Sequence, residues 1–273
     1  MEQDYSPEVL SVSSEAVASD VRSAEFVQSL ERGLSVIKSF SSGSRSLTLT
    51  EVAERTGLTR AAARRFLITL KDMGYVESDG RLFSLRPRVL ELGYSYLASL
   101  PVWEIARPYL QELADKVQET TSASVLDGDD IVFVARVETK RIMSMTLGVG
   151  SRLPAWATAM GRVLLADLGS EQLDHYFGRV TLAPLNERTV TDEQRLRKII
   201  DDAGQKGWTL VDQEVEEGVR SLAVPIRSPK GRTEAAITVC SHALRVTLDR
   251  VMDEFLPLAL ETSERVTAEL GHR

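Results

Sequence analysis

The chain has 273 residues, of which 43% are hydrophobic and 27% charged, and its formal net charge is −7. This composition is ordinary for a globular protein of two domains, or one large one, and excludes a collagen-like or mainly disordered chain. No apolar run approaches the roughly 18 residues that span a bilayer, and the acidic start lacks the features of a signal peptide, so we expect a cytoplasmic protein.

Charge is distributed unevenly along the chain. Residues 1–21 hold five acidic residues and no Lys or Arg, and we interpret 1–22 as a disordered tail. Residues 22–90 hold 12 basic and 7 acidic residues, whereas 91–273 hold 21 basic and 28 acidic residues. A basic segment beside an acidic body is typical of proteins that bind nucleic acid, although ordinary surfaces also reach this charge.

The basic segment has the pattern of a helix-turn-helix. Apolar residues at helical spacing predict a helix over 26–40. A short helix over 51–55 and a longer one over 60–73 follow, separated by a turn that contains Gly57. Thr59 is positioned to cap the longer helix. Two helices joined by a short turn with glycine form the helix-turn-helix motif.

The longer helix divides into two faces. Its core-facing side chains are predicted to be Ala62, Phe66, Leu67 and Leu70. Its outward side chains near the start are Thr59, Arg60, Arg64 and Arg65. A recognition helix needs this division, because its first half enters the major groove, where arginine contacts phosphates or guanine. A small helical bundle that packs against protein is the alternative.

A hairpin follows the helix-turn-helix. Strands are predicted over 75–77 and 81–85, around a tight turn at Asp79 and Gly80. This hairpin is the wing of a winged helix. Arg81 lies near its tip, where it reaches the DNA backbone or the minor groove, or is simply solvated.

A linker helix is predicted over 88–100. Because proline disrupts helix interiors, Pro101 and Pro108 argue against one helix that continues to residue 118. We therefore expect the next helix to begin at Pro108 and to end near residue 119.

The remainder of the chain alternates strands and helices, several of them joined by tight turns. Strands are predicted over 122–126, 131–137, 142–147, 209–213, 222–226 and 235–240, and helices over 158–168, 191–206 and 248–270. Mixed elements joined by hairpins indicate an α+β domain with an antiparallel sheet.

The sequence contains no evident catalytic or metal-binding motif. The single Cys240 cannot form an internal disulfide, and the three histidines lack partners at metal-ligand spacing, so we predict no metal, cofactor or catalytic residue. The segment RLPAWATAMG at 152–161 joins a loop to a helix start whose amides suit a carboxylate. A tightly packed junction is an equal alternative there. We interpret the acidic run at 212–217 as a solvated loop.

Both halves of the chain resemble one family. The stretch LTLTEVAERTGLTRAAARRFLITLKDMGYVESDGRLFSLRPRVLELGYSYL is similar to the DNA-binding domain of IclR-family transcriptional regulators. The stretches VGSRLPAWATAMGRVLLADL and GWTLVDQEVEEGVRSLAVPI resemble the effector-binding domain of that family. The subgroup that the chain most resembles is the Pca regulon regulators, which control catabolism of aromatic acids through protocatechuate and β-ketoadipate.

The resemblance implies a specific domain organisation. A winged helix-turn-helix DNA-binding domain is expected over 23–86, joined by a linker helix over 87–106 to a GAF-like α/β effector-binding domain with an antiparallel sheet over 107–273. It also implies that homodimers or homotetramers bind double-stranded operator DNA, and that the protein is not an enzyme.

The resemblance also implies where an effector binds. The lining residues that it implies are Ile142, Met145, Ala159, Met160, Ser221, Thr238 and Cys240. The amides at the helix start add Thr158 to this predicted site, because we expect the effector carboxylate near residues 158–160. Family members that bind small keto acids tend to have Cys at the Ser221 position and Ser at the Thr238 and Cys240 positions. The bulkier, less polar floor here favours an aromatic or longer acid such as protocatechuate, 4-hydroxybenzoate or β-ketoadipate.

We therefore predict an effector-responsive transcriptional regulator of aromatic-acid catabolism. Three alternatives remain open: a regulator of a different small-acid pathway, an enzyme acting on a small organic acid, and a winged helix that binds only protein.

Overall fold

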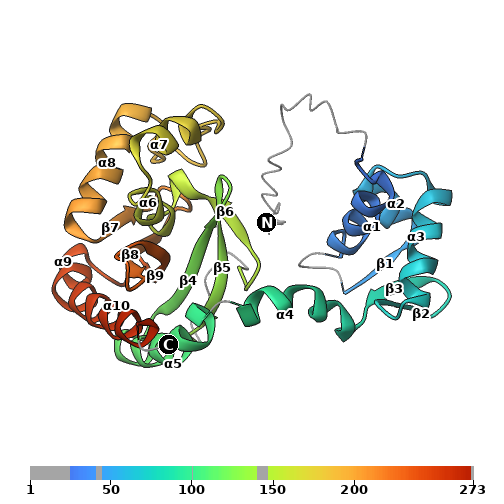
Figure 1. The fold of residues 1–273 in the computed structure, drawn as a ribbon, viewed down its shortest axis with the longest axis horizontal. Helices are drawn as coiled ribbons and strands as arrows, with labels where there is room; N and C mark the ends of the chain where they lie inside the picture. Colours follow the sequence, from blue (N-terminus) through green and yellow to red (C-terminus); the bar gives the residue numbers. More distant parts are fainter. Residues whose placement is uncertain (1–24, 41–44, 100, 140–146, 272–273) are drawn as a thin grey trace, which may run out of the picture. The chain divides into compact units, whose positions relative to one another are not determined.

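The computed structural model in Figure 1 describes residues 25–40, 45–99, 101–139 and 147–271. The chain forms two compact units that divide after Val89, and each is described by itself. The predicted tail over 1–22 lies outside the described residues, as does the predicted strand over 142–147 except for Leu147. Among the described residues, no helix is both long and apolar enough to cross a bilayer.

The N-terminal unit has the predicted winged helix-turn-helix architecture. Its helices are α1 (Gln28–Lys38), α2 (Leu49–Thr56) and α3 (Arg60–Asp72), and its strands are β1 (Ser46–Thr48), β2 (Val76–Ser78) and β3 (Leu82–Leu85). The strands form an antiparallel sheet in the order β1-β3-β2. The sequence pattern missed β1, since three residues are too few to show a period-two alternation.

Local hydrogen bonds fix the ends of α2 and α3. The Thr48 hydroxyl accepts from the Glu51 amide, and the Glu51 carboxylate accepts from the Thr48 amide at 2.7 Å. These bonds form a capping box and hold the pKa of Glu51 below its usual value. Gly57 ends α2 at φ 65°, and the Thr59 hydroxyl accepts from the Ala62 amide to begin α3.

Two apolar residues of α1 and its N-cap, Val27, are exposed. Val36 is buried in the core of the N-terminal unit, but the exposed fractions of Val27, Leu30 and Leu34 are 59%, 63% and 44%. The three exposed residues follow helical spacing and therefore form one stripe. This stripe has no partner within the described part of the N-terminal unit.

The helices of the linker region differ from the prediction at Pro108. A 3-10 turn, η1 (Pro87–Val89), leads into α4 (Leu90–Ser99), and α5 runs over Pro101–Val117 with Pro108 inside it. The prediction that a helix begins at Pro108 is wrong. Pro108 is exposed, whereas Leu110 and Leu113 are buried, so apolar packing along the other side holds the helix together at the cost of one backbone hydrogen bond.

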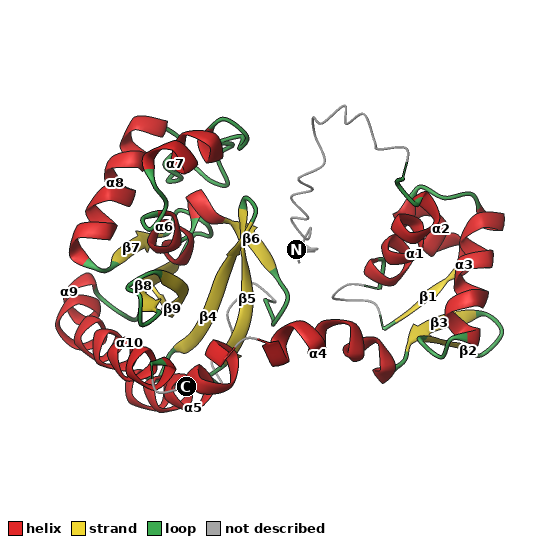
Figure 2. Cartoon of the chain, viewed as in Figure 1, coloured by secondary structure: helices red, strands yellow, loops and turns green. Residues whose placement is uncertain are grey.

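The C-terminal unit contains a six-stranded antiparallel sheet with helices on both faces (Figure 2). The strands lie in the order β6-β5-β4-β9-β8-β7 and comprise β4 (Thr120–Asp127), β5 (Asp130–Val137), β6 (Arg152–Pro154), β7 (Thr209–Asp212), β8 (Val219–Arg227) and β9 (Thr233–His242). The helical elements are η2 (Ala155–Ala157), α6 (Ala159–Leu165), α7 (Ser170–Phe177), α8 (Glu193–Lys206), α9 (Leu248–Arg250), the π-helical segment η3 (Val251–Phe255) and α10 (Leu256–Leu270). The α+β class and the antiparallel sheet are thus confirmed, whereas β6 and α7 were not predicted.

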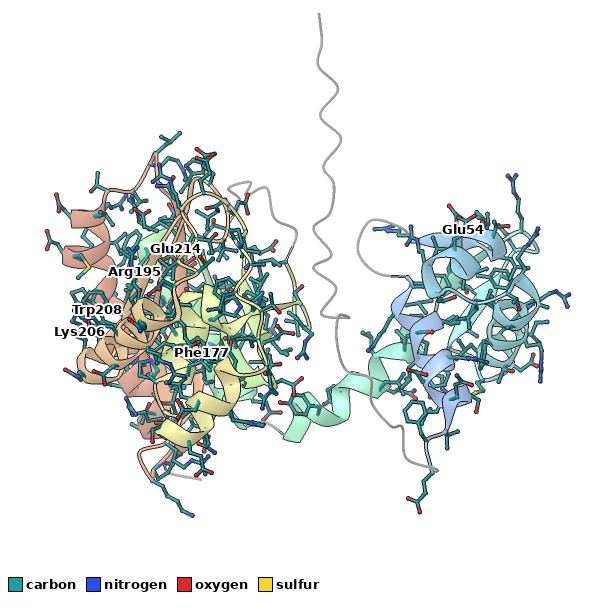
Figure 3. All side chains as sticks on the ribbon, turned by 90° about the horizontal axis from the view of Figure 1, so that it is seen from above. Glu54, Phe177, Arg195, Lys206, Trp208 and Glu214 are labelled. Carbon is teal, nitrogen blue, oxygen red and sulfur yellow. The ribbon has the colours of Figure 1, made fainter. Side chains whose placement is uncertain are left out.

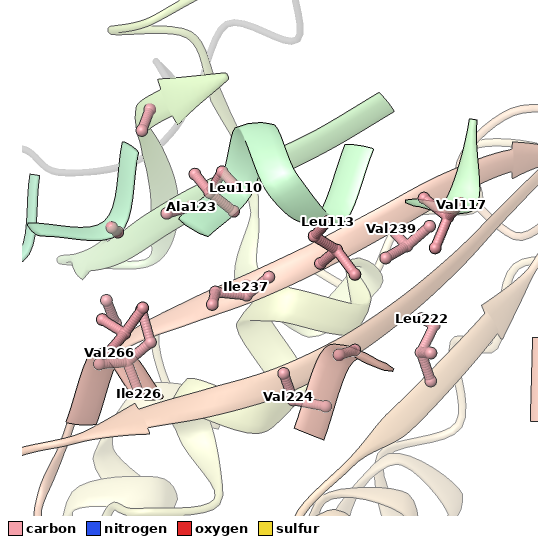
Figure 4. Packing of buried hydrophobic residues seen from close by; sticks show 14 of the residues in the cluster. Leu110, Leu113, Val117, Ala123, Leu222, Val224, Ile226, Ile237, Val239 and Val266 are labelled. Carbon is pink, nitrogen blue, oxygen red and sulfur yellow. The ribbon is translucent and has the colours of Figure 1, made fainter. Parts of the chain in front are cut away.

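Side chains alternate between the two faces of this sheet. Leu222 and Val224 of β8 lie with Ile237 of β9 in the core formed with α5 and α10 (Figure 4). Ala223 and Ala236 belong to the second core, which includes α6 and α8. The period of two along each strand therefore builds two cores, one on each face.

A buried ion pair ties α6 to the chain that follows β7. Both terminal nitrogens of Arg162 donate to the two carboxylate oxygens of Glu214, at 2.9 and 2.6 Å. The Arg162 side chain is only 1% exposed and that of Glu214 11%. Arg162 also donates to the Trp156 carbonyl, and Glu214 accepts from the Val190 amide. Each guanidinium nitrogen and each carboxylate oxygen of the pair therefore takes part in a hydrogen bond, as a buried ion pair requires.

We expect Glu214→Gln to lower the free energy of unfolding by about 3–5 kcal/mol, because it leaves the buried charge of Arg162 uncompensated. Urea denaturation of the full chain measures this loss. Glu217→Gln is the matched control, since Glu217 lies three residues further on and is exposed. Equal stability of the two variants would contradict a structural role for the pair.

Candidate functional site

The N-terminal unit presents a basic helix face. The predicted contact residues at the start of α3, Thr59, Arg60, Arg64 and Arg65, are all exposed. The opposite side of α3 buries Ala63, Leu67 and Leu70 in the core. The predicted division is therefore present, with one shift: Ala63 is buried in place of Ala62. A helix exposed in this way suits the major groove.

The wing presents a further cation. Arg81 is exposed at the turn between β2 and β3. The Asp79 carboxylate accepts from the amides of Arg81 and Leu82, at 2.9 and 2.8 Å, and these bonds hold its pKa below the usual value. Asp79 thus fixes the backbone from which the Arg81 side chain projects.

The C-terminal unit contains a pocket between the start of α6 and one face of the sheet. Its lining residues are Phe133, Arg136, Leu147, Leu153, Thr158, Ala159, Met160, Val211, Val215, Val219, Ser221, Thr238 and Cys240. An apolar pocket with a few convergent polar groups is typical of small-molecule sites.

Six of the eight predicted effector residues line this one pocket: Thr158, Ala159, Met160, Ser221, Thr238 and Cys240. They come from three elements, namely the α6 start, β8 and β9, and Thr158 and Cys240 are 82 positions apart in the sequence. Ile142 and Met145 lie outside the described residues. The structure thus brings together every predicted lining residue that it describes, while their contact with an effector stays a prediction.

The floor of the pocket is a row of small polar side chains on adjacent strands. Ser221 of β8 is paired with Cys240 of β9, and its hydroxyl lies 3.4 Å from the Cys240 sulfur. Thr238 donates its hydroxyl to the Leu222 carbonyl at 2.7 Å, which leaves the oxygen lone pairs able to accept. The floor therefore offers both donors and acceptors to a bound polar group.

The start of α6 packs closely against the turn that precedes it. A side chain at Gly161 would overlap the backbone of Ala155, so only glycine allows the helix to lie this close to the preceding turn. The Thr158 hydroxyl accepts from the Gly161 amide at 3.0 Å and caps the helix. Tyr176 of α7 accepts from the Trp156 amide at 3.0 Å, and burial raises the pKa of this phenol.

Arg136 is the one charged residue among the seven lining residues that the sequence analysis did not predict. It lies on β5 at the rim of the sheet floor, with a side chain only 7% exposed. Its Nε donates to Glu138 at 3.0 Å and its Nη1 to the Ser122 hydroxyl at 3.3 Å. An arginine within the apolar run IVFVARV was the available signal, since buried charges need a partner or a function.

The pocket offers two different groups to an effector carboxylate. The sequence analysis placed it at the amides that begin α6. With seven residues, α6 offers at most a partial positive charge of about half an elementary charge. Arg136 carries a full charge in a planar fork that matches a carboxylate. The guanidinium is therefore the stronger anion partner in this pocket.

The pocket is small. Its cavity volume of about 50 Å³ compares with the roughly 150 Å³ of an engineered protein cavity that binds benzene. A ring-sized ligand therefore requires lining side chains to move. Met160 is the most adaptable of them, since its thioether chain is unbranched, and Ser124 donates to its sulfur at 3.1 Å.

The acidic run over 212–217 is not the simple solvated loop that we expected. Asp212 pairs with Arg220 at 2.8 Å, and Glu214 with the buried Arg162. Burial raises the pKa of Glu216. Across the described ranges, no group of three or more His, Cys, Asp or Glu side chains is arranged to hold a metal ion.

A winged helix-turn-helix followed in the same chain by a sheet domain with an internal pocket defines a class of protein. It is a DNA-binding regulator that carries its own ligand-binding domain. The match to the IclR helix-turn-helix domain covers residues 29–80, and the match to the bacterial transcriptional regulator IclR C-terminal domain covers residues 94–268. The chain belongs to the IclR family of bacterial transcriptional regulators.

Two relatives and one solved structure are similar over much of the chain. The Pca regulon regulatory protein of Pseudomonas putida is 43% identical over 247 residues, which cover 90% of this chain and 85% of the relative. The p-hydroxybenzoate hydroxylase transcriptional activator of Acinetobacter baylyi is 34% identical over 252 residues, with 90% and 93% covered. The inducer-binding domain of PobR from Acinetobacter, a double mutant in complex with 3-hydroxybenzoic acid, is 32% identical, with a TM-score of 0.58 and 62% and 97% covered.

Proposed function

We propose that this protein regulates transcription of genes for aromatic-acid catabolism, of the β-ketoadipate pathway type, in response to an acid bound in the C-terminal pocket. One observation carries the proposal: the pocket joins a nearly buried arginine to a floor of hydroxyl and thiol groups. Names of relatives that refer to the Pca regulon and to p-hydroxybenzoate support the aromatic class. We place the protein in the cytoplasm, where its operator DNA lies.

The polar groups of the pocket define an orientation for the acid. Arg136 and Thr238 lie on β5 and β9, which flank β4, and both residues are paired with Ser122 of β4. Their backbones are thus two strand spacings apart, about 10 Å. An acid with a second polar group at its far end, such as 4-hydroxybenzoate, protocatechuate or β-ketoadipate, spans this separation. Its carboxylate lies at Arg136 and its other polar end at Ser221, Thr238 and Cys240.

Arg136 is available to a ligand because its present acidic partner is weak. Glu138 is 65% exposed, and an ion pair with an exposed carboxylate contributes little, about 0–1 kcal/mol. A carboxylate inside the pocket meets the same guanidinium in a less polar environment, where charge-assisted hydrogen bonds are stronger. Exchange of Glu138 for the effector carboxylate is therefore favourable.

DNA binding is proposed to use the exposed face of α3 with the wing. Arg60, Arg64 and Arg65, with Thr59, contact the major groove, and Arg81 contacts the DNA backbone or the minor groove. A dimer places two such helices on two half-sites of one operator. The proposed dimer contact is the exposed apolar stripe of α1, because a monomer gains nothing from three large apolar side chains in water.

Calorimetric titration with 4-hydroxybenzoate, protocatechuate, β-ketoadipate, pyruvate and glyoxylate tests the proposed effector. We expect saturable binding of one aromatic or β-ketoadipate-type acid, and loss of at least about tenfold in affinity for Arg136→Met, from the charge-assisted hydrogen bonds that it removes. Arg179→Met, which removes an exposed charge on the same unit, is the control. Cys240 is the chain's single cysteine, so protection of its thiol from alkylation reports occupancy of this pocket.

Binding of only pyruvate or glyoxylate would assign the protein to a different small-acid pathway. An acid that binds Arg136→Met and the parent protein equally would remove Arg136 from the site. An acid that binds without slowing alkylation of Cys240 would move the effector site elsewhere.

Arg64→Ala combined with Arg65→Ala should weaken operator binding and reduce the magnitude of its salt slope by about 2, since each phosphate contact contributes nearly one. Gel-shift titrations at several salt concentrations measure both quantities. Arg195→Ala with Arg250→Ala removes the same charge from the C-terminal unit and should change neither. Parent-like affinity and slope in the α3 variant would contradict the assignment of α3 as the recognition helix.

Leu30→Glu combined with Leu34→Glu should shift the sedimentation mass of the protein toward the monomer, because four carboxylates would face one another across the proposed dimer contact. Leu244→Glu is the control, since Leu244 is 91% exposed on the C-terminal unit. An unchanged mass for the α1 variant would show that its stripe is not the subunit contact.

A further inference from the structure

The start of the linker is attached to the end of the recognition helix. Met73 is the C-terminal cap of α3, and its carbonyl accepts a hydrogen bond of 2.8 Å from Nη1 of Arg88. Arg88 belongs to η1, which passes directly into α4 with no residue between them. One side chain therefore connects the first turn of the linker to the last turn of the helix proposed to read DNA.

The contact is chemically well matched. The carbonyls at a helix C-terminus carry a partial negative charge and lack partners within the helix, so a guanidinium is favourable there. The Arg88 guanidinium also lies 5.3 Å from the centre of the Tyr75 ring, in cation–π geometry. Gly74, between Met73 and Tyr75, has φ 81°, a left-handed conformation that favours glycine.

Backbone hydrogen bonds hold the same segment in place. The Arg86 amide donates to the Tyr75 carbonyl at 2.8 Å, and the Val89 amide to the Arg86 carbonyl at 3.0 Å. The side chain of Arg86, in contrast, is 54% exposed. Its partner carboxylate, that of the exposed Glu77, is 4.0 Å away, which is long for an ion pair. Arg88 thus makes a defined side-chain contact, whereas the ion pair of nearby Arg86 is weak. Arg86 is therefore the matched control for Arg88.

We propose that Arg88 is a positioning residue that transmits the effector signal to α3. The linker is the covalent connection between the effector-binding unit and α3, so a change in its direction acts at its first turn. With Arg88 bound to the end of α3, the linker and the recognition helix turn together. Without that contact, only the backbone hydrogen bonds of Arg86 and Val89 couple the linker to α3, so a smaller part of a change in linker direction reaches the helix. This inference rests on the proposed function.

The test measures operator affinity of the full chain, with and without the acid identified by titration, for Arg88→Met and Arg86→Met. Each variant loses one positive charge, so both lower operator affinity to a similar extent. We expect Arg88→Met alone to reduce the ratio of the two affinities, by about threefold or more, as residues on a coupling path do. Its acid affinity in the absence of DNA should match the parent protein.

An Arg88→Met protein with the parent ratio would overturn the proposal, including the case in which both of its affinities fall equally. If Arg88→Met does not fold, Arg88→Gln decides, with Arg86→Gln as its control, since it removes the cation but keeps a polar side chain: a reduced ratio supports the proposal and the parent ratio overturns it. If no acid alters operator binding by the parent protein, the proposed function fails, and that outcome is distinct from the failure of Arg88.

Discussion

The alternation of side chains across the six-stranded sheet is the constraint on which the C-terminal unit depends. Large aliphatic residues at every second position bury one face against α5 and α10. The intervening positions place small residues under α6, among them Ala223, Thr238 and Cys240. Small side chains leave space between sheet and helix, and their polar atoms line it. The same period of two that stabilises the fold therefore creates the pocket.

The Arg162–Glu214 pair maintains the other wall of that pocket. Figure 3 labels Glu214 among the crowded side chains of the C-terminal unit. The pair fixes α6 relative to the chain after β7, and Val215 next to Glu214 lines the pocket. A pair of buried charges stabilises less than an apolar contact of equal size would, but it fixes direction, because two parallel hydrogen bonds form in only one orientation. Here the fixed orientation of the pair holds α6 and Val215 in place on two sides of the pocket.

The sequence predicted what depends on local pattern and missed what depends on packing. The recognition helix, the wing and the strands of Ser221 and Cys240 follow from periodicity, capping and turns. Pro108 was misjudged because its helix is held by Leu110 and Leu113 from the other side, a tertiary contribution invisible in the local pattern. The pocket lining came from a family resemblance, since no spacing rule brings β8 and β9 to α6. Arg136 was not predicted as a lining residue, because the register of a strand, and no sequence motif, places it at the pocket.

One strand separates the pocket from the helix that follows the linker. Thr121 and Ser122 are neighbours on β4, so their side chains point to opposite faces of the sheet. The Thr121 hydroxyl donates to the Leu110 carbonyl of α5 at 2.9 Å, while the Ser122 hydroxyl accepts from Arg136 at 3.3 Å. Thr121 and Ser122 are both fully buried, and close-packed interiors transmit small displacements rather than absorb them. A carboxylate that draws Arg136 away from Ser122 therefore acts one residue from the hydrogen bond that holds α5, and α5 is the helix through which the linker joins the sheet.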